Sequence, residues 1–245
     1  MIHVFGNSHA AVFTGAPPCG NMVAKISFRD SMVHTDPHPE LPFRTWFLGP
    51  ITAYNFNEKY FPEMIAGIQS KKSWFPEGGK ILLVVGEVDC RIHLPKQARI
   101  QKNRSKESLT NEAVDRFFEA GIRLKDMGFE PMFFGTHPCI PTRNERTHKE
   151  EELGYLVDDD HWGTWGTDAE RKDFCVLYDK RLEHRCNQHG FKFLSIYKHL
   201  VDENNRTRQE YYADPVHLDH SKCINLILEE FRLAGICLDS EQRDK

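Results

Sequence analysis

The sequence has 245 residues, of which 40% are hydrophobic and 28% are charged. This balance is typical of globular proteins and argues against a disordered or fibrous chain. The formal net charge of −4, from 32 basic and 36 acidic residues, creates no field that would attract nucleic acid or an anionic membrane, so we expect neither as a partner. The length predicts one domain over residues 1–245.

The N-terminal residues and the cysteines indicate the compartment. No run of about 18 apolar residues is present, and residues 1–6 lack the basic and apolar regions of a signal peptide. Seven cysteines are scattered without a Cys-x-x-Cys spacing, which argues against a disulfide framework and against a zinc site. We therefore expect a soluble cytoplasmic protein with reduced thiols, no metal and no other cofactor.

Short apolar segments alternate with longer segments of helical periodicity, and this pattern predicts a parallel sheet with crossover helices. Residues 2–5 and 45–48 predict the first two strands, and residues 61–68 predict a helix after them. A third strand over residues 81–85 precedes an amphipathic helix over residues 111–126.

The second half of the chain continues this alternation. A fourth strand over residues 131–134 is followed by a helix that begins near Thr167 or Asp168 and ends at Gly190. Residues 191–194 predict a fifth strand, and residues 224–234 predict a final helix. The expected fold class is therefore α/β, a three-layer sandwich with helices on both faces of a five-stranded parallel sheet.

Ser8 follows the first predicted strand and a glycine. At the carboxyl end of a strand, its Oγ can face solvent while its backbone N–H lies near the start of a helix, so that a nucleophile and an oxyanion donor coincide. A serine after a strand can equally be a helix cap. This segment by itself leaves both interpretations open.

Asp214 and His217 lie in a short turn immediately before the last predicted helix. In such a turn the carboxylate can accept a hydrogen bond from the imidazole and fix its tautomer. It can also stabilise the imidazolium that forms when the histidine takes a serine proton. The alternative is that Asp214 caps the turn and His217 is a surface residue.

Four short blocks occur in order along the chain: Gly6-Asn7-Ser8, Gly49, Gly86-Glu87-Val88-Asp89 and Asp214-Pro215-Val216-His217. Over nearly the whole chain they resemble the blocks of the SGNH (GDSL-like) hydrolase family. The resemblance implies the flavodoxin-like fold of that family, with Ser8 as nucleophile, His217 as general base and Asp214 as its orienting partner. It also implies an oxyanion hole formed by the backbone N–H groups of Ser8 and Gly49.

The third block departs from the family pattern, Gly-x-Asn-Asp, because Val88 stands where the asparagine is expected. Valine cannot donate a hydrogen bond, and the loss of one oxyanion donor costs on the order of a hundredfold to a thousandfold in rate. With Cys90 and Arg91, the block resembles that of a subset of SGNH-like proteins. Arg91 or Asn55 could supply the missing donor, whereas a salt bridge from Arg91 to a nearby carboxylate is the alternative.

Two segments without periodicity, residues 14–43 and 136–166, follow strand ends, where open α/β sheets bind ligands. Acidic residues 158–160 and His161 are expected to face solvent rather than to bind a metal. Trp162 and Trp165 can stack on sugar rings, although packing of the segment explains them equally well. The candidate substrate contacts are Asn55, Glu87, Arg91, Trp162 and Trp165.

These residues predict a serine esterase that removes an acyl group, with acetyl expected, from a carbohydrate or related small substrate through an acyl-enzyme. An O-acyltransferase with the same serine is a close variant. A non-catalytic glycan-binding domain of the same fold is the alternative from another class, and Val88 is its main support. An ordinary α/β-hydrolase is disfavoured because that fold places strands before the nucleophile strand. The oligomeric state stays open.

Overall fold

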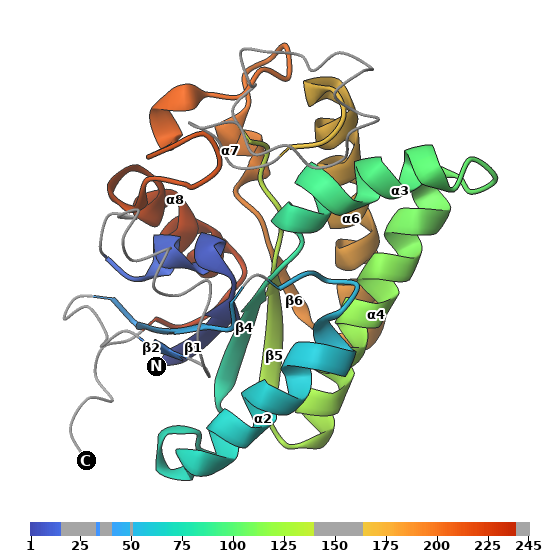
Figure 1. Ribbon diagram of the computed structural model, residues 1–245. Coiled ribbons are helices and arrows are strands. Elements are labelled where there is room, and N and C mark those ends of the chain that lie inside the picture. Colours follow the sequence, from blue (N-terminus) through green and yellow to red (C-terminus); the bar gives the residue numbers. More distant parts are fainter. Residues whose placement is uncertain (16–32, 35–40, 50, 140–163, 239–245) are drawn as a thin grey trace.

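The computed structural model describes residues 1–15, 33–34, 41–49, 51–139 and 164–238. Its sheet has the strand order β2-β3-β1-β4-β5-β6 (Figure 1). All pairings except that of β2 are parallel, which confirms the predicted α/β class with a five-stranded parallel sheet. The parallel strands are β1 (Ile2–Gly6), β3 (Phe43–Phe47), β4 (Lys80–Val84), β5 (Glu130–Phe134) and β6 (Lys192–Leu194).

A sixth strand, β2 (Val33–His34), pairs antiparallel with β3 at the edge of the sheet and was not predicted. With two residues, it is too short to show an apolar alternation. The connections from β1 lead to β3 on one side and later to β4 on the other. In an open α/β sheet this reversal leaves a crevice at the carboxyl ends of the strands beside it, where ligands bind.

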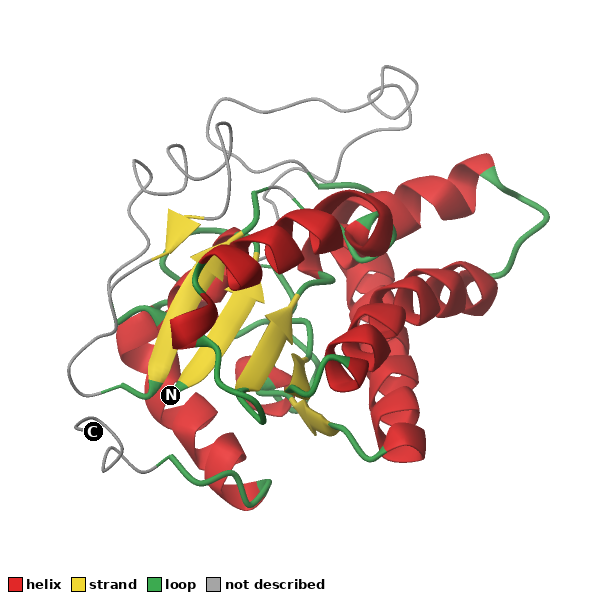
Figure 2. Cartoon of the chain, turned by 90° about the horizontal axis from the view of Figure 1, so that it is seen from below, coloured by secondary structure: helices red, strands yellow, loops and turns green. Residues whose placement is uncertain are grey.

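Three long helices cover one face of the sheet: α2 (Phe61–Ser70), α4 (Lys106–Asp126) and α6 (Asp168–His189). Figure 2 shows the strands lying between helices. α4 begins at Lys106 rather than at residue 111, because the Ser105 side chain accepts a hydrogen bond from the backbone N–H of Ser108. α6 has its predicted limits, since Thr167 forms a capping box with Glu170 and Gly190 adopts a left-handed conformation at φ 70°.

The other face is covered by a 3-10 helix, η1 (Ser8–Phe13), and by α7 (Tyr197–Leu200) and α8 (His220–Leu233). Side chains alternate between the two faces along each strand. Val4 of β1 therefore belongs to the hydrophobic cluster that includes η1 and α8, while Phe5 belongs to the cluster that includes α2, α4 and α6. The sheet thus has a hydrophobic core on each side, as a three-layer sandwich requires.

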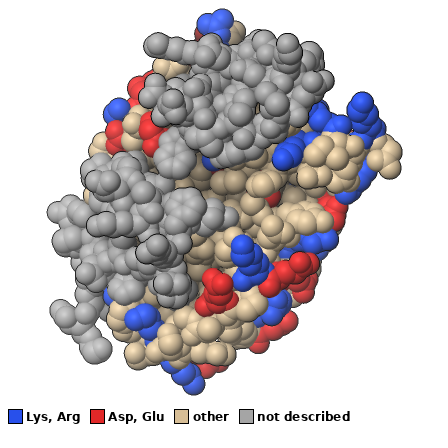
Figure 3. Space-filling model, viewed as in Figure 1, with Lys and Arg blue, Asp and Glu red and all other residues tan. Residues whose placement is uncertain are grey.

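Charged side chains of both signs share the face that Figure 3 shows, and basic ones gather at its upper right, where Figure 1 places α3 (Leu94–Ile100) and the start of α4. Several of these basic residues are paired: Arg99 with Glu170, Arg104 with Glu112 and Lys106 with Asp173. Among the described helices, none is both long enough and apolar enough to cross a membrane. The described cysteines are free, and Cys237 is the exposed one among them.

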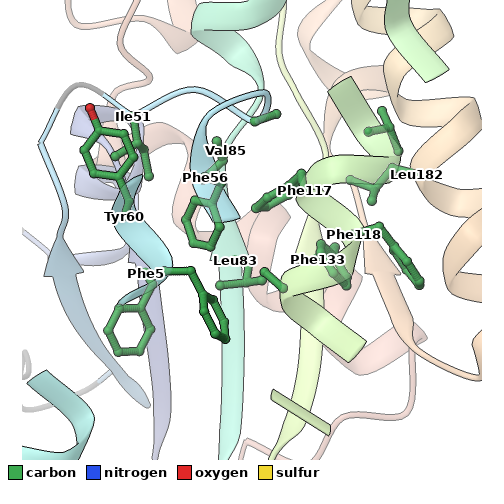
Figure 4. Packing of buried hydrophobic residues seen from close by; sticks show 14 of the residues in the cluster. Phe5, Ile51, Phe56, Tyr60, Leu83, Val85, Phe117, Phe118, Phe133 and Leu182 are labelled. Carbon is green, nitrogen blue, oxygen red and sulfur yellow. The ribbon is translucent and has the colours of Figure 1, made fainter. Parts of the chain in front are cut away.

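The core on the α4 side is dominated by aromatic rings (Figure 4). Phe117 of α4 meets Phe133 of β5 edge to face, with ring centroids 5.3 Å apart. Phe56, in the connection after β3, packs in the same way against Phe117 at 5.2 Å. Edge-to-face pairs stabilise such a core beyond their buried area. They therefore hold the connection after β3 against α4 and β5.

Several short helical segments were not predicted. η2 (Phe56–Tyr60) and η4 (Asp89–His93) are π-helical turns, and η4 runs directly into α3 (Leu94–Ile100). The remaining ones are the 3-10 turns η3 (Lys72–Trp74) and η5 (Gln209–Tyr211). Single π turns are rare and frequently occur at functional sites. Here η4 contains the end of the third sequence block.

Candidate active site

The sequence blocks meet at the carboxyl edge of the sheet, beside the end of β1. Ser8 follows β1, Gly49 follows β3, and Gly86 and Glu87 follow β4, which is the neighbour of β1 on the other side. Leu48 donates a backbone hydrogen bond to Gly6 at 2.9 Å, so the ladder between β1 and β3 continues to the edge. Residues 6–8 and residue 49 are thus neighbours although they are far apart in sequence.

Asn7 and Gly6 hold Ser8 in place. Asn7 caps η1, because its Oδ1 accepts a hydrogen bond from the backbone N–H of His9 at 3.0 Å. Its Nδ2 also donates to the carbonyl of Ile51 at 3.5 Å, which ties the start of η1 to the connection after β3. A Cβ at Gly6 would lie 2.5 Å from the Val84 carbonyl oxygen, so only glycine fits where β1 approaches β4.

Ser8, His217 and Asp214 form an unbroken hydrogen-bonded chain. Ser8 Oγ lies 2.8 Å from His217 Nε2, and His217 Nδ1 lies 2.7 Å from Asp214 Oδ2. Asp214 Oδ1 accepts the backbone N–H groups of Val216 and His217 at 2.9 and 2.8 Å. The aspartate therefore holds both the turn and the ring, and the predicted approach of Ser8 and His217 is observed.

The environment of this chain suits proton transfer from the serine. With Nδ1–H donated to Asp214, Nε2 of His217 is free of hydrogen and accepts the Ser8 hydroxyl proton. Burial alone would raise the pKa of Asp214, but His217 and the two backbone N–H groups hold that pKa below its usual value. The ring of His217 is buried, with 2% of its side chain exposed. Asp214 therefore stays ionised beside the buried ring of His217.

Two backbone N–H groups at the edge are candidates for stabilising an oxyanion. Within the described part of the chain, neither the N–H of Ser8 nor that of Gly49 donates a hydrogen bond to another group. Gly49 adopts φ +82°, in the left-handed region where glycine is favoured. Unoccupied donors beside a nucleophile are what an oxyanion hole requires.

The third block connects two strand ends. Val88 is half-buried and begins the π turn η4, and it offers no donor. Asp89 accepts the backbone N–H of Ala53 at 2.7 Å, and burial raises the pKa of this carboxyl to about 7. The connections after β3 and β4 are thereby held together by a buried hydrogen bond.

Glu87 and Arg91 are placed side by side and buried. Arg91 Nε donates to Glu87 Oε1 at 2.6 Å, and the side chains are only 7% and 4% exposed. This is the salt bridge that was the alternative for Arg91 in the sequence. The guanidinium is thereby directed at Glu87 through its Nε.

Of the remaining candidate contacts, the structure describes Asn55 and Trp165. Asn55 is exposed and lines a pocket between α3, α4 and the connection after β3. Trp165 is half-buried, donates its backbone N–H to the carbonyl of Arg91 at 3.0 Å, and lies with its ring beneath Lys96 Nζ. Trp162 and the acidic residues 158–160 lie outside the described residues.

Two histidines near Ser8 were not predicted. His9 Nε2 lies 2.5 Å from Glu87 Oε2, and the His9 ring stacks on that of His217. His137, which follows β5, lies with its Nε2 3.2 Å from His9 Nδ1. Both follow strand ends, like the first three blocks, and that position was the signal available in the sequence.

Solved structures of other proteins resemble this fold, whereas the comparisons based on sequence found no match. No protein-family model matches the chain. No curated protein matches it either. A proposed acylhydrolase from Bacteroides fragilis is similar at a TM-score of 0.54 and 11% identity, over 96% of this chain and 88% of that chain. A catalytic mutant of an acetylxylan esterase from Geobacillus stearothermophilus is similar at 0.53 and 11% identity, over 100% of this chain and 96% of that one.

The chain has the fold of these hydrolases. The likeness extends over the whole sheet and over both helical layers, because nearly the full length of each chain is covered. At this identity it shows the fold, and the chemistry has to be argued from the site.

Proposed function

We propose that this protein is a serine esterase of the SGNH type, with Ser8, His217 and Asp214 as its catalytic residues. The hydrogen-bonded chain from Ser8 Oγ through His217 to Asp214 is the observation that carries the proposal. Nucleophile, base and orienting group within hydrogen-bond reach are the signature of acyl transfer through a covalent intermediate. The likeness in fold to an acetylxylan esterase supports an acetyl ester of a carbohydrate as the substrate class.

The reaction follows from this geometry. Ser8 Oγ attacks the acyl carbon while His217 Nε2 takes the hydroxyl proton, and Asp214 stabilises the imidazolium. The tetrahedral oxyanion faces the backbone N–H groups of Ser8 and Gly49. The C–O bond to the alcohol then breaks and His217 protonates the leaving oxygen. Water, deprotonated by His217, hydrolyses the acyl-enzyme to a carboxylic acid and restores Ser8.

Because Val88 replaces the asparagine of the family pattern, we expect a lower rate of ester hydrolysis. Two backbone donors remain for the oxyanion, and each donor of this kind is worth on the order of a hundredfold to a thousandfold in rate. We therefore expect real but slow turnover compared with a three-donor site. Fewer donors lower kcat more than they raise KM, because the oxyanion exists only in the transition state.

The pocket that contains Asn55 suits the alcohol part of such an ester. It has a volume of about 280 Å³ and begins at Thr52, three residues beyond Gly49. Among the described residues, the side chains of Asn55 and His93 have no hydrogen-bond partner there. Free amide and imidazole groups in a pocket that is also lined by apolar Leu94 and Leu109 are of the kind that bind sugar hydroxyls.

Asn55→Ala tests this assignment. We expect a rise in KM of about fivefold for an acetylated xylo-oligosaccharide, the loss of roughly one hydrogen bond. Steady-state kinetics on p-nitrophenyl acetate, which has no sugar, should stay unchanged. Asn111→Ala, at an exposed position of α4 that does not line the pocket, is the matched control. Equal effects of Asn55→Ala on both substrates would rule the pocket out as a sugar site.

The central test of the proposed function is to detect the acyl-enzyme. Wild-type protein mixed rapidly with p-nitrophenyl acetate should gain the mass of one acetyl group, and peptide mapping should locate it on Ser8. Release of acetate into water then defines an esterase, whereas transfer to an added sugar defines an acyltransferase. A protein that never acquires the acetyl group, with Ser8→Ala behaving like wild type, would be the glycan-binding alternative.

A further inference from the structure

A cluster of buried polar side chains lies behind the catalytic base, and the reaction as derived does not use it. It consists of His9, Glu87, Arg91 and His137, all of which are buried. Buried ionisable groups are costly unless they are paired, so their arrangement has consequences for charge in the site.

Glu87 lies at the centre of the cluster. Its Oε1 accepts Arg91 Nε at 2.6 Å, and its Oε2 lies 2.5 Å from His9 Nε2. Burial opposes its ionisation, but Arg91 and His9 hold the pKa of Glu87 below its usual value. The carboxylate is therefore ionised, and the Arg91 guanidinium already balances its charge.

His9 connects this ion pair to the catalytic base. Its ring stacks on that of His217 with centroids 4.9 Å apart and an interplanar angle of 29°. Its Nδ1 lies 3.2 Å from Nε2 of His137, whose pKa burial lowers to about 3. A neutral His9 that carries its proton on Nε2, beside Glu87, and accepts at Nδ1 from His137 is compatible with both contacts.

The charge of His9 matters because His217 becomes an imidazolium during the reaction. A second positive ring at this distance would oppose that step, whereas a neutral ring does not. Burial lowers the pKa of His9, while Glu87 acts in the opposite direction. The charged and titratable groups around the two rings are Glu87, Arg91, His137 and Asp214.

We propose that the Glu87–Arg91 ion pair keeps His9 uncharged against the face of His217, so that His9 is a positioning residue for the general base. This rests on the proposed esterase function. Without Arg91, the unbalanced carboxylate would draw a proton onto His9. Ester cleavage would then require His9 as well as His217 to lose a proton, so the acid limb of the pH profile would move to higher pH.

The first experiment measures the protonation of His9 directly, by NMR of protein labelled with 15N-histidine. It does not depend on turnover, so its failure is distinct from failure of the esterase proposal. We expect His9 to be neutral at pH 7 in the wild type, charged in Arg91→Met, and neutral again in Glu87→Gln/Arg91→Met. A charged His9 in the wild type, or a neutral one in folded Arg91→Met, would overturn the proposal.

The second experiment is the pH profile of kcat/KM on p-nitrophenyl acetate for the same proteins. The acid limb of Arg91→Met should lie about one pH unit or more higher than that of wild type, with a tenfold loss on its acid side. The double variant should return the limb to the wild-type position. If both variants keep the wild-type limb, the ion pair has no influence on the base.

A pair of His9 variants covers the case in which Arg91→Met does not fold. His9→Ala removes the stacked ring and should lower kcat about tenfold with KM unchanged. His9→Phe restores an uncharged ring and should recover most of that loss. If His9→Phe is no faster than His9→Ala, with both proteins folded by circular dichroism, the ring does not position His217.

Discussion

Ser8→Ala is expected to lower kcat/KM on p-nitrophenyl acetate by about a thousandfold or more, without loss of fold. In the proposed mechanism Ser8 Oγ attacks the acyl carbon, and this atom makes a hydrogen bond with His217 alone among the described residues. Loss of a triad nucleophile removes nearly all catalysis except the contribution of substrate binding and the oxyanion donors. Initial rates measure the first effect, and thermal unfolding monitors the second.

Two further proteins make this test specific. Ser70→Ala removes an exposed hydroxyl at the end of α2, where Oγ bonds only the carbonyl of Gly67, and should leave kcat/KM unchanged. Ser8→Ala/His217→Ala should be no slower than Ser8→Ala alone, because triad side chains act as one unit. Multiplicative losses in the double variant, or more than about a tenth of the activity in Ser8→Ala, would refute the assigned roles.

Gly86→Ala is expected to destabilise the protein by about 3 kcal/mol or more. Gly86 adopts φ +128°, and a Cβ there would lie 2.6 Å from two ring carbons of Tyr178. Tyr178 is fully buried and hydrogen-bonded to the Val85 carbonyl, so its ring cannot move away. For a protein of this size, the corresponding fall in melting temperature is roughly 6–12 °C, measurable by differential scanning calorimetry.

Gly78→Ala separates the steric effect from backbone strain. Gly78 also has a positive φ, +71°, but a Cβ there would meet no atom within 4 Å. It should therefore cost only about 1–2 kcal/mol of conformational strain. If the two alanine variants melted at the same temperature, the close approach of Tyr178 would not be the reason that residue 86 must be glycine.

The strands and long helices could be predicted because their signals are local. Apolar runs closed by Gly6 or Gly86 mark strand ends, and Thr167 with Gly190 marks both ends of α6 by capping alone. The blocks at strand ends then indicated one catalytic edge, because parallel strands place their carboxyl ends together. Ser8 lies at this edge for that reason, and the turn before α8 brings His217 to it, although neither segment alone distinguished a catalytic residue from a cap.

The features that could not be predicted depend on contacts between distant segments. β2 is a strand only because two residues find the edge of β3. The spacing of Glu87 and Arg91 made their pairing foreseeable. No local pattern shows that His9, near the start of the chain, lies beside the second carboxylate oxygen of Glu87. The pocket around Asn55 likewise exists only where α3 and α4 meet the connection after β3.

The hydrogen bond between Ser8 and His217 joins residues 209 positions apart, one at the end of β1 and the other in the turn before α8. All five parallel strands are paired once β6 ends at Leu194, and the turn that holds His217 belongs to the segment after it. That segment rests on η1 through α8, where His220 Nδ1 lies 2.5 Å from the Val12 carbonyl. Local unfolding of this segment would therefore separate base from nucleophile while the sheet stays intact. Ester cleavage would cease at temperatures or denaturant concentrations below those that melt the domain, which makes activity a reporter of how firmly the last helix is docked.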